Sequence, residues 1–147
     1  MDDTSFIQEG ELMGNNMELG YEMFCYQCEQ TAGGKGCTKL GVCGKTPEIA
    51  GLQDLLIFQI KGISCYAKTF IEQEQHVDKS IVTFIENALF TTLTNVNFDA
   101  DAHVKLLRQS QEIKETLKSS VGEINNPTYH ATYKLPNDKN EMLKDAY

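Results

Sequence analysis

The sequence has too few basic residues to suggest a nucleic-acid-binding protein. Its 147 residues include 13 Lys and Arg against 21 Asp and Glu, for a formal net charge of −8. Binding to a phosphate backbone requires clustered Lys and Arg side chains. The composition therefore argues against nucleic acid as a main partner.

Long hydrophobic runs and targeting signals are also missing. The densest apolar cluster, residues 55–58, is soon interrupted by Gln59 and Lys61, whereas a membrane-spanning helix needs about 18 or more apolar residues. The N-terminus has neither the basic and apolar regions of a signal peptide nor the Arg residues of a transit peptide. We therefore expect no membrane association and a cytoplasmic, reducing location.

Residues 1–22 have no regular hydrophobic spacing. They carry six acidic side chains and no Lys or Arg. This pattern predicts a disordered acidic extension, and a short docked helix around residues 6–13 is the alternative.

Four of the five cysteines lie within 19 residues, spaced C-x2-C-x8-C-x5-C. In a chain without secretion signals, four close thiols favour a metal site over disulfides. Structural zinc usually takes two C-x2-4-C pairs, and the second pair fits that rule poorly. Iron–sulfur clusters accept wider spacings in one loop, so we favour a cluster over zinc or redox thiols. The four residues are Cys25, Cys28, Cys37 and Cys43.

The rest of the loop suits a negatively charged metal cluster. Residues 23–46 contain several glycines, which let a backbone approach a ligand closely. Lys35, Lys39 and Lys45 are the only charged residues between positions 30 and 47. Their positive charges would offset the negative charges of thiolate ligands.

The remainder of the chain has helical spacing. Thr46 and Pro47 are typical of a helix start, and apolar residues then follow at helical intervals. We predict an all-α fold, in which a Gly/Cys-rich cluster-binding loop precedes an antiparallel three-helix bundle. The predicted helices span 47–74, 79–94 (capped by Asp78 or Ser80) and about 99–121 (capped by Asp99 or Asp101 and stopped at Gly122).

These patterns predict four segments along the chain. They are the extension (1–22), the iron–sulfur-binding loop (23–46), the helical bundle (47–124), and a linker with the truncated start of another element (125–147).

Other residues that could bind a metal lack a suitably spaced partner. Cys65 is predicted to be a buried small hydrophobe on the first helix. The three histidines, His76, His103 and His130, are predicted to be surface or helix-end residues rather than ligands.

The residues around the cysteines resemble the N-terminus of the hybrid cluster proteins, also called prismane proteins or hydroxylamine reductases. The resemblance rests on Met23-Phe-Cys-Tyr-Gln-Cys-Glu-Gln-Thr-Ala, Gly36-Cys-Thr, Gly41-Val-Cys-Gly-Lys, Leu52-Gln-Asp-Leu-Leu-Ile and Lys61-Gly. It is dense over residues 23–67 and continues more weakly to Tyr133-Lys-Leu-Pro.

The resemblance implies that Cys25, Cys28, Cys37 and Cys43 bind a cubane [4Fe–4S] cluster, because their spacing matches the cubane group of the family. In the family, this cluster passes electrons to a hybrid iron–sulfur–oxygen cluster that reduces hydroxylamine or nitric oxide. A redox donor protein and downstream domains are the implied partners.

No stretch of the sequence matches the family's hybrid-cluster ligands. We therefore expect a truncated or isolated first domain and assign no catalytic residue. The rival interpretation from another functional class is a helical interaction module without redox activity, in which the four cysteines hold a stabilising zinc ion.

Overall fold

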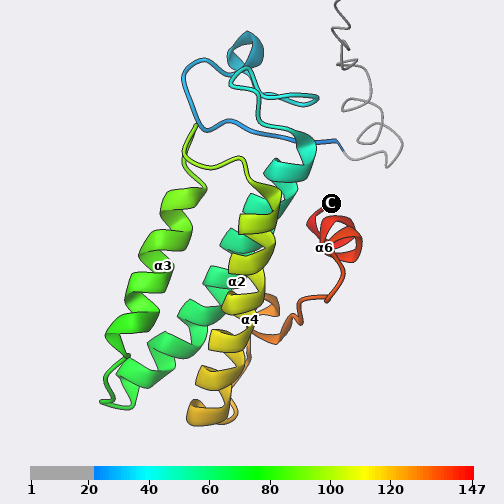
Figure 1. Cartoon of the computed structure of the whole chain (residues 1–147). Helices are drawn as coiled ribbons and strands as arrows, with labels where there is room; N and C mark the ends of the chain where they lie inside the picture. Colours follow the sequence, from blue (N-terminus) through cyan, green and yellow to red (C-terminus); the bar gives the residue numbers. More distant parts are fainter. Residues whose placement is uncertain (1–21) are drawn as a thin grey trace, which may run out of the picture.

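The computed structural model describes residues 22–147, which are mostly helical (Figure 1). Within these residues there is no strand, only an isolated bridge between Cys25 and Cys37. The predicted all-α class is confirmed. Apart from Glu22, the predicted acidic extension lies outside the described residues. The elements are η1 (Ala32–Gly34), α2 (Pro47–Glu72), α3 (Lys79–Thr91), α4 (Ala100–Val121), α5 (Tyr129–Thr132) and α6 (Lys139–Ala146).

Short polar side chains begin the long helices, as predicted. Thr46, Asp78 and Asp99 each accept a backbone N–H from the first turn of α2, α3 and α4, respectively. Such caps satisfy amide groups that have no partner within the helix. Gly122 ends α4 with a φ of 78°. The structure therefore selects Asp78 and Asp99 from the two pairs of candidate caps.

The three long helices alternate in direction (Figure 1). Helix α2 starts beside the cysteine loop and runs away from it, α3 returns towards the loop, and α4 runs away again. Helix α2 is the centre of the domain, because α4, α5 and α6 all pack on it, whereas α3 contacts it more sparsely. No helix in the described part of the chain is long and apolar enough to cross a bilayer.

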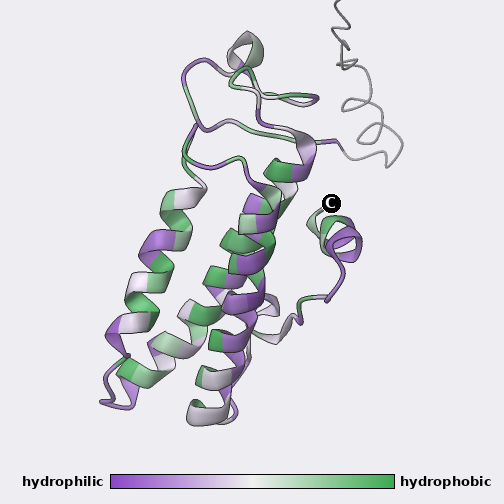
Figure 2. Cartoon of the chain, viewed as in Figure 1, coloured by the Kyte–Doolittle hydropathy of each residue, from purple (hydrophilic) through white to green (hydrophobic). Residues whose placement is uncertain are grey.

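One apolar cluster joins these helices. Hydrophobic residues recur along α2 and α3, whereas α4 carries long hydrophilic stretches (Figure 2). Phe84 and Ala88 of α3 are buried, while Val82, Leu89 and Phe90 of the same helix are exposed. The buried residues of the cluster are Leu52, Leu55, Leu56, Ile60, Ile63, Tyr66, Phe84, Ala88, Val104, Leu107, Leu117, Ala131, Met142 and Leu143.

The segment 125–147 contributes to this same cluster. It contains α5 and α6, and its residues Ala131, Met142 and Leu143 are buried with those of α2. Gly62 of α2 permits the contact, because a Cβ at this position would collide with the carbonyl oxygen of His130. The backbone that approaches this glycine is that of His130 in α5.

A buried ammonium lies where α2, α4 and the segment after α5 meet. Lys114 of α4 is only 1% exposed. Its Nζ donates to Gln59 Oε1 at 2.5 Å and to the carbonyl oxygen of Tyr133 at 2.6 Å. A buried charge is tolerated only when it is well hydrogen-bonded. Burial lowers the pKa of Lys114 from 10.5 to about 8.

Replacing Gly62 with Ala should destabilise the chain, although Ala is the better helix former. The added methyl group would meet the His130 carbonyl and Lys114 Cδ. Overpacking of this kind costs about 1–3 kcal/mol, measurable by urea unfolding. Gly51→Ala is the control, because there the methyl group meets the far end of a side chain, the ring of Tyr147, and no backbone atom of another segment. Equal stability of the two variants would contradict this account.

Lys114 should make the chain more stable as pH rises from about 8 to 9.5. Unfolded Lys114 keeps a proton that the folded side chain releases above pH 8, so the unfolded state binds more protons and unfolding becomes less favourable. The expected gain is about 1–2 kcal/mol by urea unfolding. Lys114→Met should abolish it, whereas Lys118→Met, at an exposed position, should retain it. An unchanged gain in Lys114→Met would contradict the prediction.

Candidate metal centre

The cysteine loop sits at the N-terminal end of α2 (Figure 1). A small apolar cluster anchors it, in which Met23 and Cys37 are buried with Ala50 of α2 and Cys25 packs against them. The loop approaches itself closely at Gly36, whose φ is 150° and where a Cβ would collide with the ring of Phe24. These contacts hold the first and third cysteines near the helix.

Cys25 and Cys37 are paired through their backbones. The N–H of each donates to the carbonyl oxygen of the other, with both N···O distances at 2.9 Å. The segment from one cysteine to the other therefore forms a closed loop, which contains Cys28 and η1. Gly33 and Gly34 of η1 have positive φ angles of 60° and 66°.

The sulfur of Cys37 lies close to a backbone amide and a hydroxyl group. Thr31 Oγ1 lies 3.5 Å from Cys37 Sγ, and the Ala32 N–H donates to the same sulfur at 3.4 Å. Hydrogen bonding with the Thr31 side chain first, and from the Ala32 amide second, lowers the pKa of the Cys37 thiol. Since thiolates are the metal-binding form of cysteine, this environment suits a ligand.

The three lysines of the loop are not equivalent. Lys35 and Lys39 are exposed, whereas Lys45 is only 3% exposed. Lys45 Nζ lies 3.8 Å from Cys25 Sγ and 3.5 Å from Gln27 Oε1. The sequence predicted positive charge around the cysteines, but only the fold shows which lysine is directed inward.

Gln27 connects the loop to the helical body. Its Nε2 donates to the carbonyl oxygen of Thr92 at 2.9 Å, and its Oε1 accepts from Thr94 Oγ1 at 3.2 Å. Both partners belong to the connection between α3 and α4. The residue between two candidate ligands thus fixes the loop against a segment that is distant in sequence. The sequence offered no signal for this contact beyond the position of Gln27 beside Cys28.

His103 is a helix-end residue, which is one of the two positions predicted for it, and it does not lie at the surface. It lies in the first turn of α4 and is fully buried. Its Nδ1 lies 2.7 Å from the carbonyl oxygen of Asp99, and its Nε2 lies 3.4 Å from Nε2 of buried Gln53. Gln53 also donates to the carbonyl oxygen of Asn97 at 3.1 Å. His103 therefore helps hold the α3–α4 connection.

The other candidates lie apart from the loop. Half-buried Cys65 packs against the main core, as a small hydrophobe would, and its sulfur lies 3.2 Å from Thr128 Oγ1. His130 stacks on Phe58, with ring centroids 4.3 Å apart. His76 is exposed after α2. None of these residues belongs to the cysteine loop.

The structure thus brings Cys25 and Cys37 together and places half-buried Cys28 and Cys43 in the same loop. Within residues 22–147, no three His, Cys, Asp or Glu side chains are arranged to hold a single metal ion. The thiols, the amide donors at Cys37 and the ammonium at Cys25 nevertheless fit the chemistry of a thiolate-ligated cluster. The ligand assignment itself stays a prediction.

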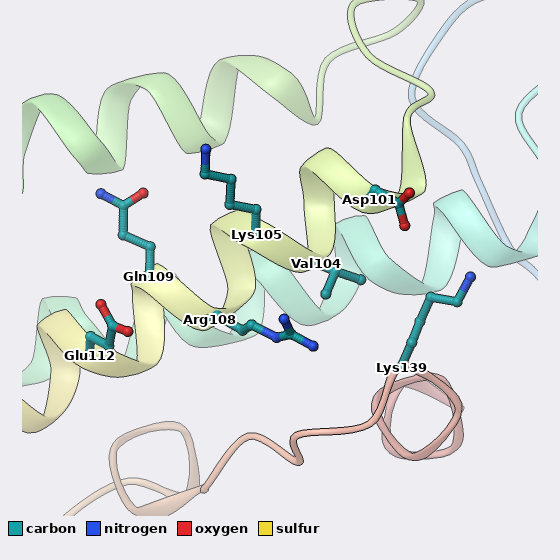
Figure 3. Close-up of a pocket in the computed structure, with 7 residues that line it drawn as sticks. All are labelled: Asp101, Val104, Lys105, Arg108, Gln109, Glu112 and Lys139. Carbon is teal, nitrogen blue, oxygen red and sulfur yellow. The ribbon is translucent and has the colours of Figure 1, made fainter.

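A separate groove of about 670 Å³ lies along α4. Figure 3 shows Arg108 directed from α4 towards the segment before α6 and Lys139 directed from α6 towards α2, while Lys105 and Gln109 point towards α3. Lys139 forms an ion pair with Glu48 at 2.7 Å, and Arg108 donates to a backbone carbonyl. The groove has no cysteine or histidine among its lining residues, so it is not part of the candidate metal centre.

Comparisons with known proteins show what the chain is similar to. A sequence model of the Prismane/CO dehydrogenase family matches residues 23–147. A hydroxylamine reductase of Bacteroides thetaiotaomicron is 47% identical over 105 residues, which cover 71% of this chain and 19% of that protein. Another, from Moorella thermoacetica, is 55% identical over 83 residues, covering 56% of this chain and 19% of that protein. The chain therefore spans about a fifth of the length of these curated relatives.

Replacing Gln27 with Ala should loosen the α3–α4 connection. The change removes hydrogen bonds to Thr92 and Thr94, each contributing about 0.5–1.5 kcal/mol. Hydrogen exchange should therefore accelerate about fivefold or more in residues 92–97, with α2 and α4 unchanged. Gln30→Ala, at an exposed position of the same loop, is the control. Unchanged exchange in Gln27→Ala would show that this link does not hold the connection.

Proposed function

Because the chain belongs to the Prismane/CO dehydrogenase family, we propose that it binds a [4Fe–4S] cluster and acts as an electron-transfer domain. The ligands would be the four loop cysteines, Cys25, Cys28, Cys37 and Cys43. When bound, such a cluster supplies reversible one-electron transfer. No residue of this chain is assigned a catalytic role.

The observation that carries the proposal is the environment of Cys37. Its backbone pairing with Cys25 holds two of the proposed ligands side by side. The Ala32 N–H donates to its sulfur, and the Thr31 hydroxyl, which donates to the Cys25 carbonyl oxygen, lies 3.5 Å from the same sulfur. Hydrogen bonds to ligand sulfurs stabilise the thiolate and are one way in which proteins adjust iron–sulfur centres. A structural cysteine in an apolar core would not need these donors.

The wider reaction is part of the same proposal. The relatives described above are named hydroxylamine reductases. We infer that the domain serves an oxidoreductase that reduces hydroxylamine to ammonia, or reduces nitric oxide. Since the chain corresponds to about a fifth of those proteins, the proposal assigns the reaction and its hybrid cluster to downstream domains. A redox donor protein would supply the electrons.

Anaerobic reconstitution of the 147-residue chain with iron and sulfide tests the proposal. We expect a brown protein with about four iron and four sulfide per chain, and an EPR signal after reduction by dithionite. Ser substitution of each of the four loop cysteines should reduce the bound iron, because each removes a thiolate ligand. Cys65→Ser is the matched control and should bind iron like the unchanged chain.

The same samples distinguish the zinc alternative. One zinc per chain without acid-labile sulfide would support a structural zinc module held by the four cysteines and contradict the electron-transfer proposal. A colourless, iron-free chain after reconstitution would also contradict it.

A further inference from the structure

Lys45 is a buried cation held beside a proposed cluster ligand. It is the only lysine of the described loop that is not exposed. Its Nζ lies 3.8 Å from Cys25 Sγ. Together with Phe24, Gln27 and Gln53 it lines a small cavity of about 230 Å³ between the loop and α2.

Among residues 22–147 no carboxylate lies within 4.0 Å of the Lys45 ammonium, and the acidic residue that shares its cavity, Asp54 of α2, interacts with it only at longer range. The acceptors of the ammonium are the neutral amide oxygen of Gln27 and the sulfur of Cys25. Burial of an unpaired ammonium is costly. A negatively charged thiolate ligand at Cys25, 3.8 Å from the ammonium, would compensate this charge at closer range than Asp54.

Lys45 is also held in position through both its backbone and its side chain. The Gly41 N–H donates to the carbonyl oxygen of Lys45 at 2.8 Å, which closes a tight turn around Cys43. At the side-chain end, Gln27 is fixed by Thr92 and Thr94 and presents its oxygen to the ammonium. The position of the charge is thus built into the fold rather than left to a mobile surface side chain.

We propose that Lys45 is a positioning residue that raises the reduction potential of the cluster bound by the loop. This inference rests on the proposed function. Reduction adds one electron, supplied by the redox donor protein, and makes the ligated cluster more negative. A fixed positive charge near a ligand sulfur, shielded from water, favours the reduced form. The exposed Lys35 and Lys39 would contribute less, because solvent screens their charges.

An EPR-monitored redox titration of the reconstituted chain tests this role. In Lys45→Met, the ratio of reduced to oxidised cluster at a fixed potential should fall about tenfold or more, equivalent to about 59 mV for one electron. Lys45→Arg keeps the charge, so its ratio of reduced to oxidised cluster should stay close to that of the unsubstituted chain. Lys39→Met, which removes an exposed charge from the same loop, should change the ratio by less than about threefold.

The outcomes separate this inference from the proposed function. Iron and sulfide in all variants with an unchanged potential in Lys45→Met would overturn the inference and leave the electron-transfer proposal intact. Equal shifts of the reduction potential in Lys45→Met and Lys39→Met would also overturn it, because the effect would then come from the overall charge of the loop and not from the position of Lys45.

If Lys45→Met does not assemble a cluster, a second variant tests the same inference. Gln27→Ala keeps the ammonium but removes the acceptor that holds it. It should lower the potential in the same direction by a smaller amount, and an unchanged potential would overturn the inference. A wild-type chain without iron would overturn both proposals.

Discussion

The packing of the helices must supply hydrogen-bond acceptors to the buried ammonium of Lys114. An ammonium without solvent needs acceptors around it, and α4 alone cannot provide them. The acceptors come from Gln59 on α2 and from the backbone carbonyl of Tyr133. The chain after α4 must therefore return to α2, and the absence of a side chain at Gly62 gives it room to do so. The hydrogen bonds of Lys114 and the apolar core thus require the same arrangement of segments.

The cysteine loop repeats this principle on a smaller scale. Lys45 is buried against Cys25, and Gln27 connects the same region to the α3–α4 connection. Gln53 of α2 donates to the Asn97 carbonyl oxygen of that connection and contacts His103 in the first turn of α4. The geometry of the proposed ligands therefore depends on helices that contribute no ligand. The sparse packing of α3 on α2 makes these polar contacts important for the position of the connection.

Local signals predicted much of the fold. Thr46, Asp99 and Gly122 mark helix ends because their effects act within one turn of the chain. The predicted first helix extended two residues beyond Glu72, where the observed helix ends. The closely spaced cysteines likewise identified the candidate site. The burial of Lys114 and His103 was not predicted, because Lys is usually exposed and the partners of both residues are distant in sequence.

The sequence by itself determined the helical class, the approximate positions of the three long helices and the four cysteines of the candidate site, because spacing and capping are properties of neighbouring residues. Only the tertiary structure decided that Lys45, rather than Lys35 or Lys39, is buried beside Cys25. It also decided that residues 125–147 pack on α2. These outcomes depend on contacts between distant segments, and a side chain's cost of burial is known only once its partners are in place.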